Sequence, residues 1–252
     1  MTITSSHNQK LKEIRKLRMR RRERERAGRF VAEGEDLLAA ADAAGWRPLE
    51  RYCAAGSGLP GIEVEAKLLA TASGLGSGTR ALGVYAERWA EQPLGPLCVY
   101  LHGVHDPGNV GAILRSAEAF GASSVALGPG SADPYSPKAV RASMGAVFAV
   151  PVARVSEGPG AGINRLPGLK IALVAGAGAP LKELWRSGSA PRNQNAKVAT
   201  TLLIGAEREG LPEDVIRQAD AIAHIPISTH SLNAAMAATV ALYEATRMAP
   251  AE

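Results

Sequence analysis

The stretch LCVYLHGVHDPGNVGAILRSAEAFG, residues 97–121, contains the two building blocks that repeat through the second half of the chain. It begins with an apolar run as long as a buried strand. After Asn109, apolar side chains recur three and four positions apart, which is typical of a helix packed on one face, and Gly121 ends that helix. A strand that leads into a helix, repeated along the chain, predicts an α/β domain with a mostly parallel sheet covered on both faces.

The same alternation continues to the end of the chain. We expect further strands at residues 124–127, 147–152, 170–174, 201–204 and 221–227, and helices at residues 109–120, 137–144 and 231–247. Ligands of open α/β sheets bind beyond the carboxyl ends of the strands. The residues that follow each strand are therefore the first candidates for a functional site.

The residues before this region predict a separate unit. Residues 91–96 read Glu-Gln-Pro-Leu-Gly-Pro, a composition typical of a linker. Short strand and helix patterns from residue 30 onward predict a small α/β domain. We therefore divide the chain into four parts: a basic segment (residues 1–29), a small domain (residues 30–90), the linker (residues 91–96) and a second domain (residues 97–252). The small domain also includes part of the basic segment.

Charge is concentrated at the beginning of the chain. The first 29 residues hold eleven Lys or Arg and three Glu, a net charge of +8; the whole chain carries +5, so the other 223 residues sum to −3. Clustered cations release counterions from a phosphate backbone, which favours a polyanion partner. Residues 10–26 suit a helix with a thin apolar stripe of Leu11, Ile14 and Leu17. A solvated charged helix, a disordered arm and an RNA-contacting element all fit this pattern.

Composition excludes several other classes of protein. Apolar residues make up 46% and charged residues 21%, and the mean hydropathy is −0.03, as in globular proteins. The charge-free stretch at residues 142–153 is too short to span a bilayer, and the N-terminus has no apolar leader. Cys53 and Cys98 are isolated, without metal-ligand spacing. We expect a cytoplasmic protein without a metal or a membrane partner.

Three polar clusters follow predicted strands. The first, residues 102–115, ends at Arg115, which lies nearly opposite the apolar stripe of its helix and meets either solvent or a phosphate. The second, residues 205–210, is a loop bounded by two glycines that carries Glu207. The third, residues 225–235, contains Ser231, a candidate N-cap of the last helix.

In this order the clusters resemble a known family. NVGAILR (109–115), IGAEREGL (204–211), IPI (225–227) with SLNAA (231–235), and LYE (242–244) look like the three motifs of the SpoU (TrmH-like) class of SPOUT RNA methyltransferases. The resemblance covers about residues 97–252. The first 90 residues resemble more loosely the substrate-binding domain that many members carry.

The resemblance implies a fold and an activity. The fold would be an α/β SPOUT domain with a parallel sheet and a deep C-terminal trefoil knot, preceded by a small α/β RNA-binding domain. A homodimer formed through the catalytic domain would transfer a methyl group from S-adenosylmethionine to a ribose 2′-hydroxyl of RNA.

The resemblance also implies roles for individual residues. Arg115 would orient the target hydroxyl or its phosphate, and Glu207 would hold that guanidinium or a neighbouring motif. The catalytic set is Asn109, Arg115, Glu207, Ser231 and Asn233. The cofactor contacts are Leu203, Gly205, Glu207, Gly210, Ile225, Leu232 and Ala234. The expected RNA contacts are Arg18, Arg21, Arg22, Lys138 and Arg141.

Alternatives remain. Ribosomal RNA is the favoured substrate because of the resemblance of the small domain; transfer RNA is the alternative. A non-catalytic RNA-binding or ribosome-associated factor is a further alternative, although Asn109, Arg115, Glu207 and Asn233 are all present. A nicotinamide enzyme is disfavoured, because the Gly-x-Gly after residues 170–174 has Leu181 at its third glycine position.

Overall fold

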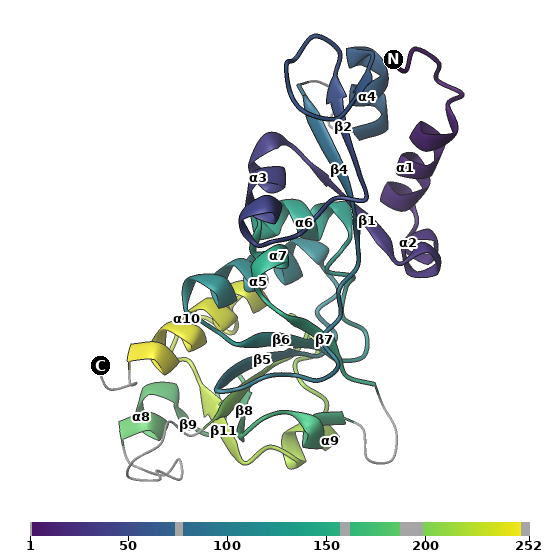
Figure 1. Ribbon diagram of the computed structural model, residues 1–252. Coiled ribbons are helices and arrows are strands. Elements are labelled where there is room, and N and C mark those ends of the chain that lie inside the picture. The colour runs from purple at the N-terminus through teal and green to yellow at the C-terminus, as the bar shows by residue number, and fades with distance from the viewer. Residues whose placement is uncertain (1, 74–77, 157–161, 187–198, 248–252) are drawn as a thin grey trace. The chain divides into compact units, whose positions relative to one another are not determined.

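The computed structural model describes residues 2–73, 78–156, 162–186 and 199–247. The chain forms two compact units (Figure 1). Unit 1 comprises Met1–Arg88 and Asp133–Ala149, and unit 2 comprises Trp89–Ala132 and Val150–Glu252. The chain first passes from unit 1 to unit 2 between Arg88 and Trp89, and the predicted linker, residues 91–96, lies just after this point. Residues 133–149 belong to unit 1, whereas the predicted boundaries assign them to the second domain.

Unit 1 is built on a four-stranded sheet in the order β1-β4-β2-β3. Its strands are β1 Arg29–Glu33, β2 Glu50–Ala54, β3 Ile62–Val64 and β4 Ala81–Ala86. β4 is antiparallel to β1 and β2, and β2 is parallel to β3. The helices of this unit are α1 Gln9–Met19, α2 Arg21–Ala27, α3 Glu35–Ala43, α4 Ala66–Ser73, α6 Pro137–Ser143 and α7 Ala146–Ala149.

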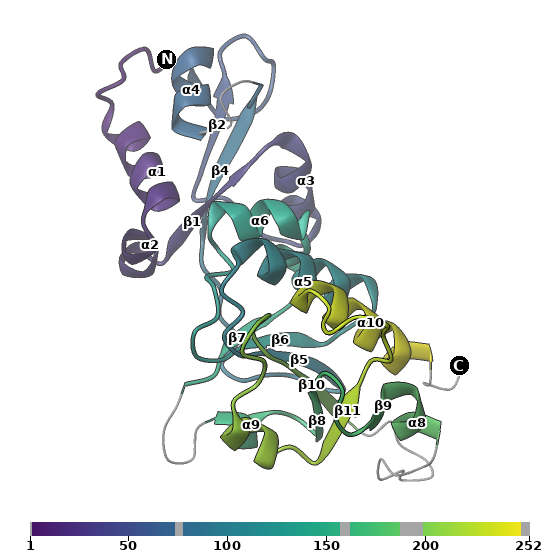
Figure 2. The ribbon, with the colours of Figure 1, turned by 180° about the vertical axis from the view of Figure 1, so that it is seen from behind.

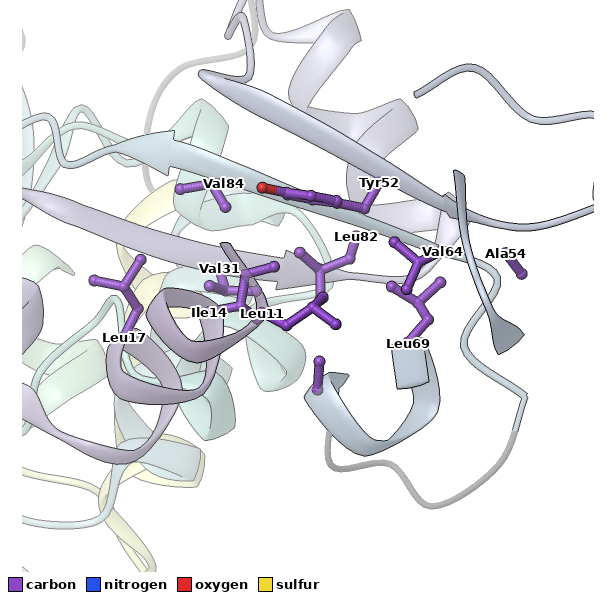
Figure 3. Close-up of a cluster of buried hydrophobic side chains, with 11 residues drawn as sticks. Leu11, Ile14, Leu17, Val31, Tyr52, Ala54, Val64, Leu69, Leu82 and Val84 are labelled. Carbon is purple, nitrogen blue, oxygen red and sulfur yellow. The ribbon is translucent and has the colours of Figure 1, made fainter. Parts of the chain in front are cut away.

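The basic segment is an integral part of unit 1. The Asn8 side chain accepts a hydrogen bond from the Lys10 N–H at 2.9 Å and caps α1. Leu11, Ile14 and Leu17 are buried, and Figure 3 shows them on the side of α1 that faces the sheet. The predicted stripe is confirmed, and the disordered arm is excluded. The single helix expected at residues 10–26 is wrong, because Arg20 has an extended backbone that separates α1 from α2.

Aromatic and ionic contacts hold residues 133–149 in unit 1. The ring of Phe30, on β1, lies 4.6 Å from the ring of Tyr135 and 5.9 Å from that of Phe148, between centroids. The Arg24 guanidinium donates to Asp133 Oδ2 from Nη2 at 2.6 Å and from Nε at 2.8 Å. Both side chains of this ion pair are buried. Two segments more than a hundred residues apart in the chain therefore share one core.

Unit 2 contains a seven-stranded, entirely parallel sheet in the order β7-β6-β5-β10-β8-β11-β9. Its strands are β5 Leu97–Leu101, β6 Ser124–Leu127, β7 Val152–Arg154, β8 Leu169–Leu173, β9 Ala179–Pro180, β10 Thr200–Ile204 and β11 Ala221–His224. Its helices are α5 Pro107–Ala119, the 3₁₀ helix η1 Gly162–Arg165, α8 Leu181–Arg186, α9 Glu213–Arg217 and α10 Ala234–Arg247. The predicted parallel sheet is confirmed.

Helices cover both faces of this sheet. In Figures 1 and 2, α5 and α10 lie side by side over one face. On the other face, Leu203 of β10 packs with Ile163 of η1 and Val215 of α9. The strand expected at residues 147–152 is wrong in its first half, where α7 ends at Ala149, and the strand itself begins at Val152. A short apolar run fits a buried helix as well as a strand.

Candidate active site

The three motif loops follow β5, β10 and β11, and the carboxyl ends of parallel strands meet at one edge of a sheet. At this edge one residue from each motif enters a single hydrogen-bonded network: Asn109 from the first turn of α5, Glu207 from the loop after β10 and Asn233 from the loop after β11. Asn109 Nδ2 donates to a Glu207 carboxylate oxygen. Asn233 Nδ2 donates to Asn109 Oδ1 at 3.1 Å. Residues more than a hundred positions apart in the sequence thus form one continuous polar chain.

The direction of these hydrogen bonds is fixed at both ends of the network. Asn233 Oδ1 accepts from the backbone N–H groups of Ala235 and Met236, at 2.9 and 3.4 Å, in the first turn of α10. Since those groups can only donate, the oxygen of Asn233 must face the helix and its nitrogen must face Asn109. A Glu207 carboxylate oxygen accepts from the Asn109 amide, so Asn109 presents its nitrogen there. Each amide has one possible orientation.

The structure shows which side chains cap α5 and α10. Asp106 caps α5, because its Oδ1 accepts from the Gly108 N–H at 2.7 Å. The side chain of Asn109 therefore remains available to Glu207. Asn233, not Ser231, accepts from the first turn of α10. Ser231 is exposed in the preceding loop.

A tight loop presents Glu207. Ala206 and Gly210 exchange two backbone hydrogen bonds, at 3.1 and 3.0 Å. A Cβ on Gly205 would lie 2.2 Å from the Gly210 carbonyl carbon, so only glycine fits there. Gly210 has a φ of +69°, in the left-handed region that favours glycine. The two glycines that bound the second motif are therefore required by the shape of the loop that carries the carboxylate.

A hollow of about 510 Å³ lies at the carboxyl ends of β8 and β11, and β8 is the neighbour of β10, the strand that leads to Glu207. It is lined by Ala175, Gly176, His224, Ile225, Pro226, Ile227, Thr229 and His230. His224 Nδ1 donates to the Ala177 carbonyl oxygen at 3.3 Å, and the Val174 N–H donates to the Ala223 carbonyl at 2.9 Å. These bonds fix the turn after β8 as one wall of the hollow.

Of the predicted cofactor contacts, Ile225 lines the hollow. Gly205, Glu207 and Gly210 form the neighbouring loop, and Leu232 and Ala234 flank Asn233. Leu203 lies in the core on the α9 face, fully buried, so its side chain is not at this edge.

Sequence reasoning missed the wall formed by Ala175 and Gly176. The strand-end rule already pointed to it, because both residues lie within three positions of the end of β8 at Leu173. Gly178, the second glycine of the Gly-x-Gly, has a packing role, since a Cβ there would lie 2.1 Å from the Ile222 carbonyl oxygen. The short strand β9 follows it, rather than the helix that a dinucleotide-binding turn would open.

Arg115 is exposed on α5, as its position opposite the apolar stripe predicts. It lies six residues beyond Asn109, about 9 Å farther along the helix axis. Within the described ranges of the chain, no hydrogen bond or ion pair joins its guanidinium to the network. The structure therefore unites Asn109, Glu207 and Asn233 but does not bring Arg115 to them.

The predicted RNA contacts of unit 1 have different surroundings. Arg18 forms an ion pair with Glu33 and donates to the Ala72 carbonyl oxygen at 2.8 Å. Arg141 lies 3.9 Å from the same carboxylate, whose pKa is raised by burial against the opposing effect of the two arginines. Arg21 pairs with Glu25 at 2.9 Å. Arg22 and Lys138 are exposed.

Other chemistries find little support in the described part of the chain. There, no group of three His, Cys, Asp or Glu side chains is arranged to hold a metal ion. Burial raises the pKa of the Cys98 thiol to about 11, so it stays protonated at neutral pH and is no nucleophile. None of the helices described is both long and apolar enough to cross a membrane.

Two family models match the chain. The SpoU rRNA Methylase family matches residues 96–243, more than half of the chain, and this range includes all three loops of the network. The MRM3-like substrate binding domain matches residues 8–76, which include α1, α2 and the first three strands of unit 1.

Similar proteins cover the whole chain. The AdoMet-bound rRNA methyltransferase of Sinorhizobium meliloti has a TM-score of 0.84 and 30% identity, and the match covers 100% of this chain and 99% of that one. AviRb, a SpoU methyltransferase of Streptomyces viridochromogenes solved with AdoMet, has a TM-score of 0.77 and 26% identity, over 96% and 98%. The 23S rRNA (guanosine(2553)-2'-O)-methyltransferase RlmP of Bacillus subtilis is 27% identical, over 96% and 97%.

Other relatives match only in part. An uncharacterized tRNA/rRNA methyltransferase of Mycobacterium tuberculosis is 36% identical over 58% of this chain, and the match spans 50% of the length of that protein.

Proposed function

The chain belongs to the SpoU rRNA Methylase family, and from this premise we propose that it transfers a methyl group from S-adenosylmethionine (AdoMet) to a ribose 2′-hydroxyl of ribosomal RNA. The observation that carries the proposal is the network of Asn233, Asn109 and Glu207, which joins the three motif loops at one sheet edge. Relatives aligned over nearly their full length are named as rRNA or 23S rRNA methyltransferases, which favours rRNA over transfer RNA.

The residues at the sheet edge fit AdoMet. The hollow has the volume of a typical small-molecule site, and it combines apolar walls such as Ile225 and Ile227 with backbone groups of the turn at Ala175 and Gly176. Gly205 keeps the neighbouring loop free of side-chain bulk. The bound cofactor supplies a methyl group activated by its positively charged sulfur. In this proposal Leu232 and Ala234 contact it from the third motif, and Leu203 is left out.

The remaining chemistry falls to the protein. A ribose hydroxyl is a very weak acid, so the site must align its oxygen with the methyl group and assist loss of its proton. An arginine stays protonated at neutral pH, so Arg115 orients the hydroxyl or an adjacent phosphate rather than acting as a base. Asn109, held by Glu207 and Asn233, presents fixed neutral dipoles beside the reacting groups.

The resemblance adds a homodimer and a trefoil knot to the proposal. Exposed apolar side chains on α10 support the dimer: Met236 and Tyr243, seven residues apart and therefore on one side of the helix, are 62% and 46% exposed. A second copy packed there would cover this apolar side. The knot would be formed by residues from about 202 to the end of α10, and the proposed location of the enzyme is the cytoplasm.

One experiment tests the activity in two steps. Titration calorimetry of the purified protein should show AdoMet binding, and incubation with a protein-free 23S rRNA transcript should produce a single 2′-O-methylated nucleotide. Arg115→Ala should bind AdoMet with unchanged affinity but transfer the methyl group at least ~100-fold more slowly, because positioning of the acceptor is lost.

Absence of AdoMet binding would refute the proposed enzyme class. An Arg115→Ala variant with the wild-type single-turnover rate would remove Arg115 from the reaction.

A further inference from the structure

We propose that unit 1 binds the RNA phosphate backbone through the outer face of α1, centred on Lys12 and Lys16, and that most other cations of the basic segment are held in ion pairs or hydrogen bonds within unit 1. This inference rests on the proposed function for the identity of the partner. It replaces the expectation that Arg18 and Arg21 make those contacts.

Most cations of the basic segment form an ion pair or a hydrogen bond. Of its eleven Lys and Arg, six pair with a carboxylate. These pairs are Lys10 with Glu50, Arg18 with Glu33, Arg21 with Glu25, Arg24 with Asp133, Arg26 with Glu23 and Arg29 with Glu13. A seventh cation, Arg15, donates to the Ser6 carbonyl oxygen at 3.2 Å. Among the residues that the structure describes, Lys12, Lys16, Arg20 and Arg22 have no carboxylate partner.

Lys12 and Lys16 occupy the centre of the exposed face of α1. At about 100° per residue, the mean direction of Leu11, Ile14 and Leu17 and that of the two lysines differ by about 180°. Those three apolar side chains are buried, and both lysines are exposed. The lysines follow one another by about 6 Å along the helix axis.

The outer face carries no compensating negative charge. Glu13 is the single acidic residue of α1, and Arg29 holds it at 3.2 Å. Met19, 81% exposed, lies on the same side as the lysines and is uncharged. On α1, Lys12 and Lys16 are thus exposed without a carboxylate partner, whereas Lys10 and Arg18 pair with Glu50 and Glu33. Unpaired, clustered cations attract a polyanion, because binding releases counterions from its phosphates.

RNA fits this face better than a membrane surface does. A helix that binds in the membrane interface needs a free apolar face, and the apolar face of α1 is buried against the sheet of unit 1. The match to a substrate binding domain includes the whole of α1. Phosphate contacts of this kind position RNA without reading its sequence.

The test is a charge-matched pair of double variants in the full-length protein. K12Q/K16Q and R21Q/R26Q each remove two positive charges from the basic segment, but only the first removes cations without a carboxylate partner. The probe is a 23S rRNA transcript, and binding is measured over a series of KCl concentrations. AdoMet affinity and the thermal unfolding midpoint of each variant are recorded alongside.

We expect K12Q/K16Q to bind RNA several-fold more weakly. The slope of log K against log salt should fall in magnitude by about 1.4 to 1.8, since each lost phosphate contact accounts for about 0.7 to 0.9. R21Q/R26Q should keep the wild-type slope. AdoMet affinity and the unfolding midpoint should be unchanged in both.

A wild-type slope in K12Q/K16Q, or an equal loss in the two variants, would overturn the inference. If the wild-type protein methylates RNA while K12Q/K16Q keeps its slope, the surface is wrong and the proposed function stands. If K12Q/K16Q loses slope but the wild-type protein neither binds AdoMet nor methylates RNA, the surface stands and the proposed function falls.

Discussion

At the scale of single residues, Asn233 has two separable roles. Its oxygen caps α10 and its nitrogen donates to Asn109. Aspartate is as good an N-cap as asparagine but has no donor. Asn233→Asp should therefore keep the free energy of unfolding within about 0.5 kcal/mol of wild type. Methyl transfer should fall at least ~10-fold, because Asn109 then faces a carboxylate at both ends of its amide.

Asn233→Ala is the matched variant, since it removes both roles. It should lose the same activity and, in addition, about 1 kcal/mol of stability with the cap. Chemical denaturation and single-turnover transfer measure the two effects. An Asn233→Asp enzyme with full activity would reduce Asn233 to a helix cap.

Sequence alone identified the residues of the network but not their contacts. Ser231 and Asn233 are both good N-caps, so propensity could not choose between them. Charge was harder to interpret. The helical period separates Arg18 from Lys16, but it does not show that Arg18 has a carboxylate partner, because only the fold brings Glu33 to it.

At the scale of the element, the loop between β10 and α9 depends on two glycines for different reasons. A Cβ on Gly205 would collide with the backbone of Gly210, whereas a Cβ on Gly210 would meet no atom within 4 Å. Gly205→Ala should therefore displace the loop and abolish AdoMet binding. Gly210→Ala should lower the free energy of unfolding only by the strain of its positive φ, about 1 to 2 kcal/mol. This variant should still bind AdoMet, but more weakly than the wild-type protein does.

Titration calorimetry, with unfolding midpoints as the control for folding, compares the two variants. Equal AdoMet affinity in both would mean that the shape of this loop does not determine binding.

Most elements of unit 2 were predictable because strand and helix differ in period and length. The elements of either unit that differ from the prediction have physical causes. The apolar run at residues 147–152 is too short to reveal a period, and α7 occupies its first half. The two-residue β9 has no pattern of its own and exists through pairing with β11. The break at Arg20 also left no signal, because the residues on both sides favour a helix.

At the scale of the whole molecule, the unexpected feature is that residues 133–149 belong to unit 1. They leave the parallel sheet after β6 and return before β7. Their position depends on contacts with Arg24 and Phe30, which no local pattern reveals. The basic segment therefore helps to hold unit 1 together, and deleting residues 1–29 would remove part of its core.

This role predicts a specific dependence of stability on one arginine. Arg24→Ala leaves Asp133 buried without its cation, and the free energy of unfolding should fall by about 3 to 5 kcal/mol. The matched control is Arg26→Ala, which removes the exposed pair with Glu23 and should cost less than about 1 kcal/mol. Urea unfolding of both variants is monitored by tryptophan fluorescence, to which Trp46, a buried residue of unit 1, contributes.

A double variant shows whether the loss comes from the stranded carboxylate. Replacing both partners by apolar residues, in R24M/D133L, should recover most of the stability, because no buried charge then lacks a partner. The RNA affinity of Arg24→Ala should fall at all salt concentrations, since unit 1 opens. K12Q/K16Q should change only the salt-dependent part of the RNA affinity. If Arg24→Ala is as stable as Arg26→Ala, the basic segment is an accessory arm, and loss of RNA binding on its deletion could be assigned to its charges.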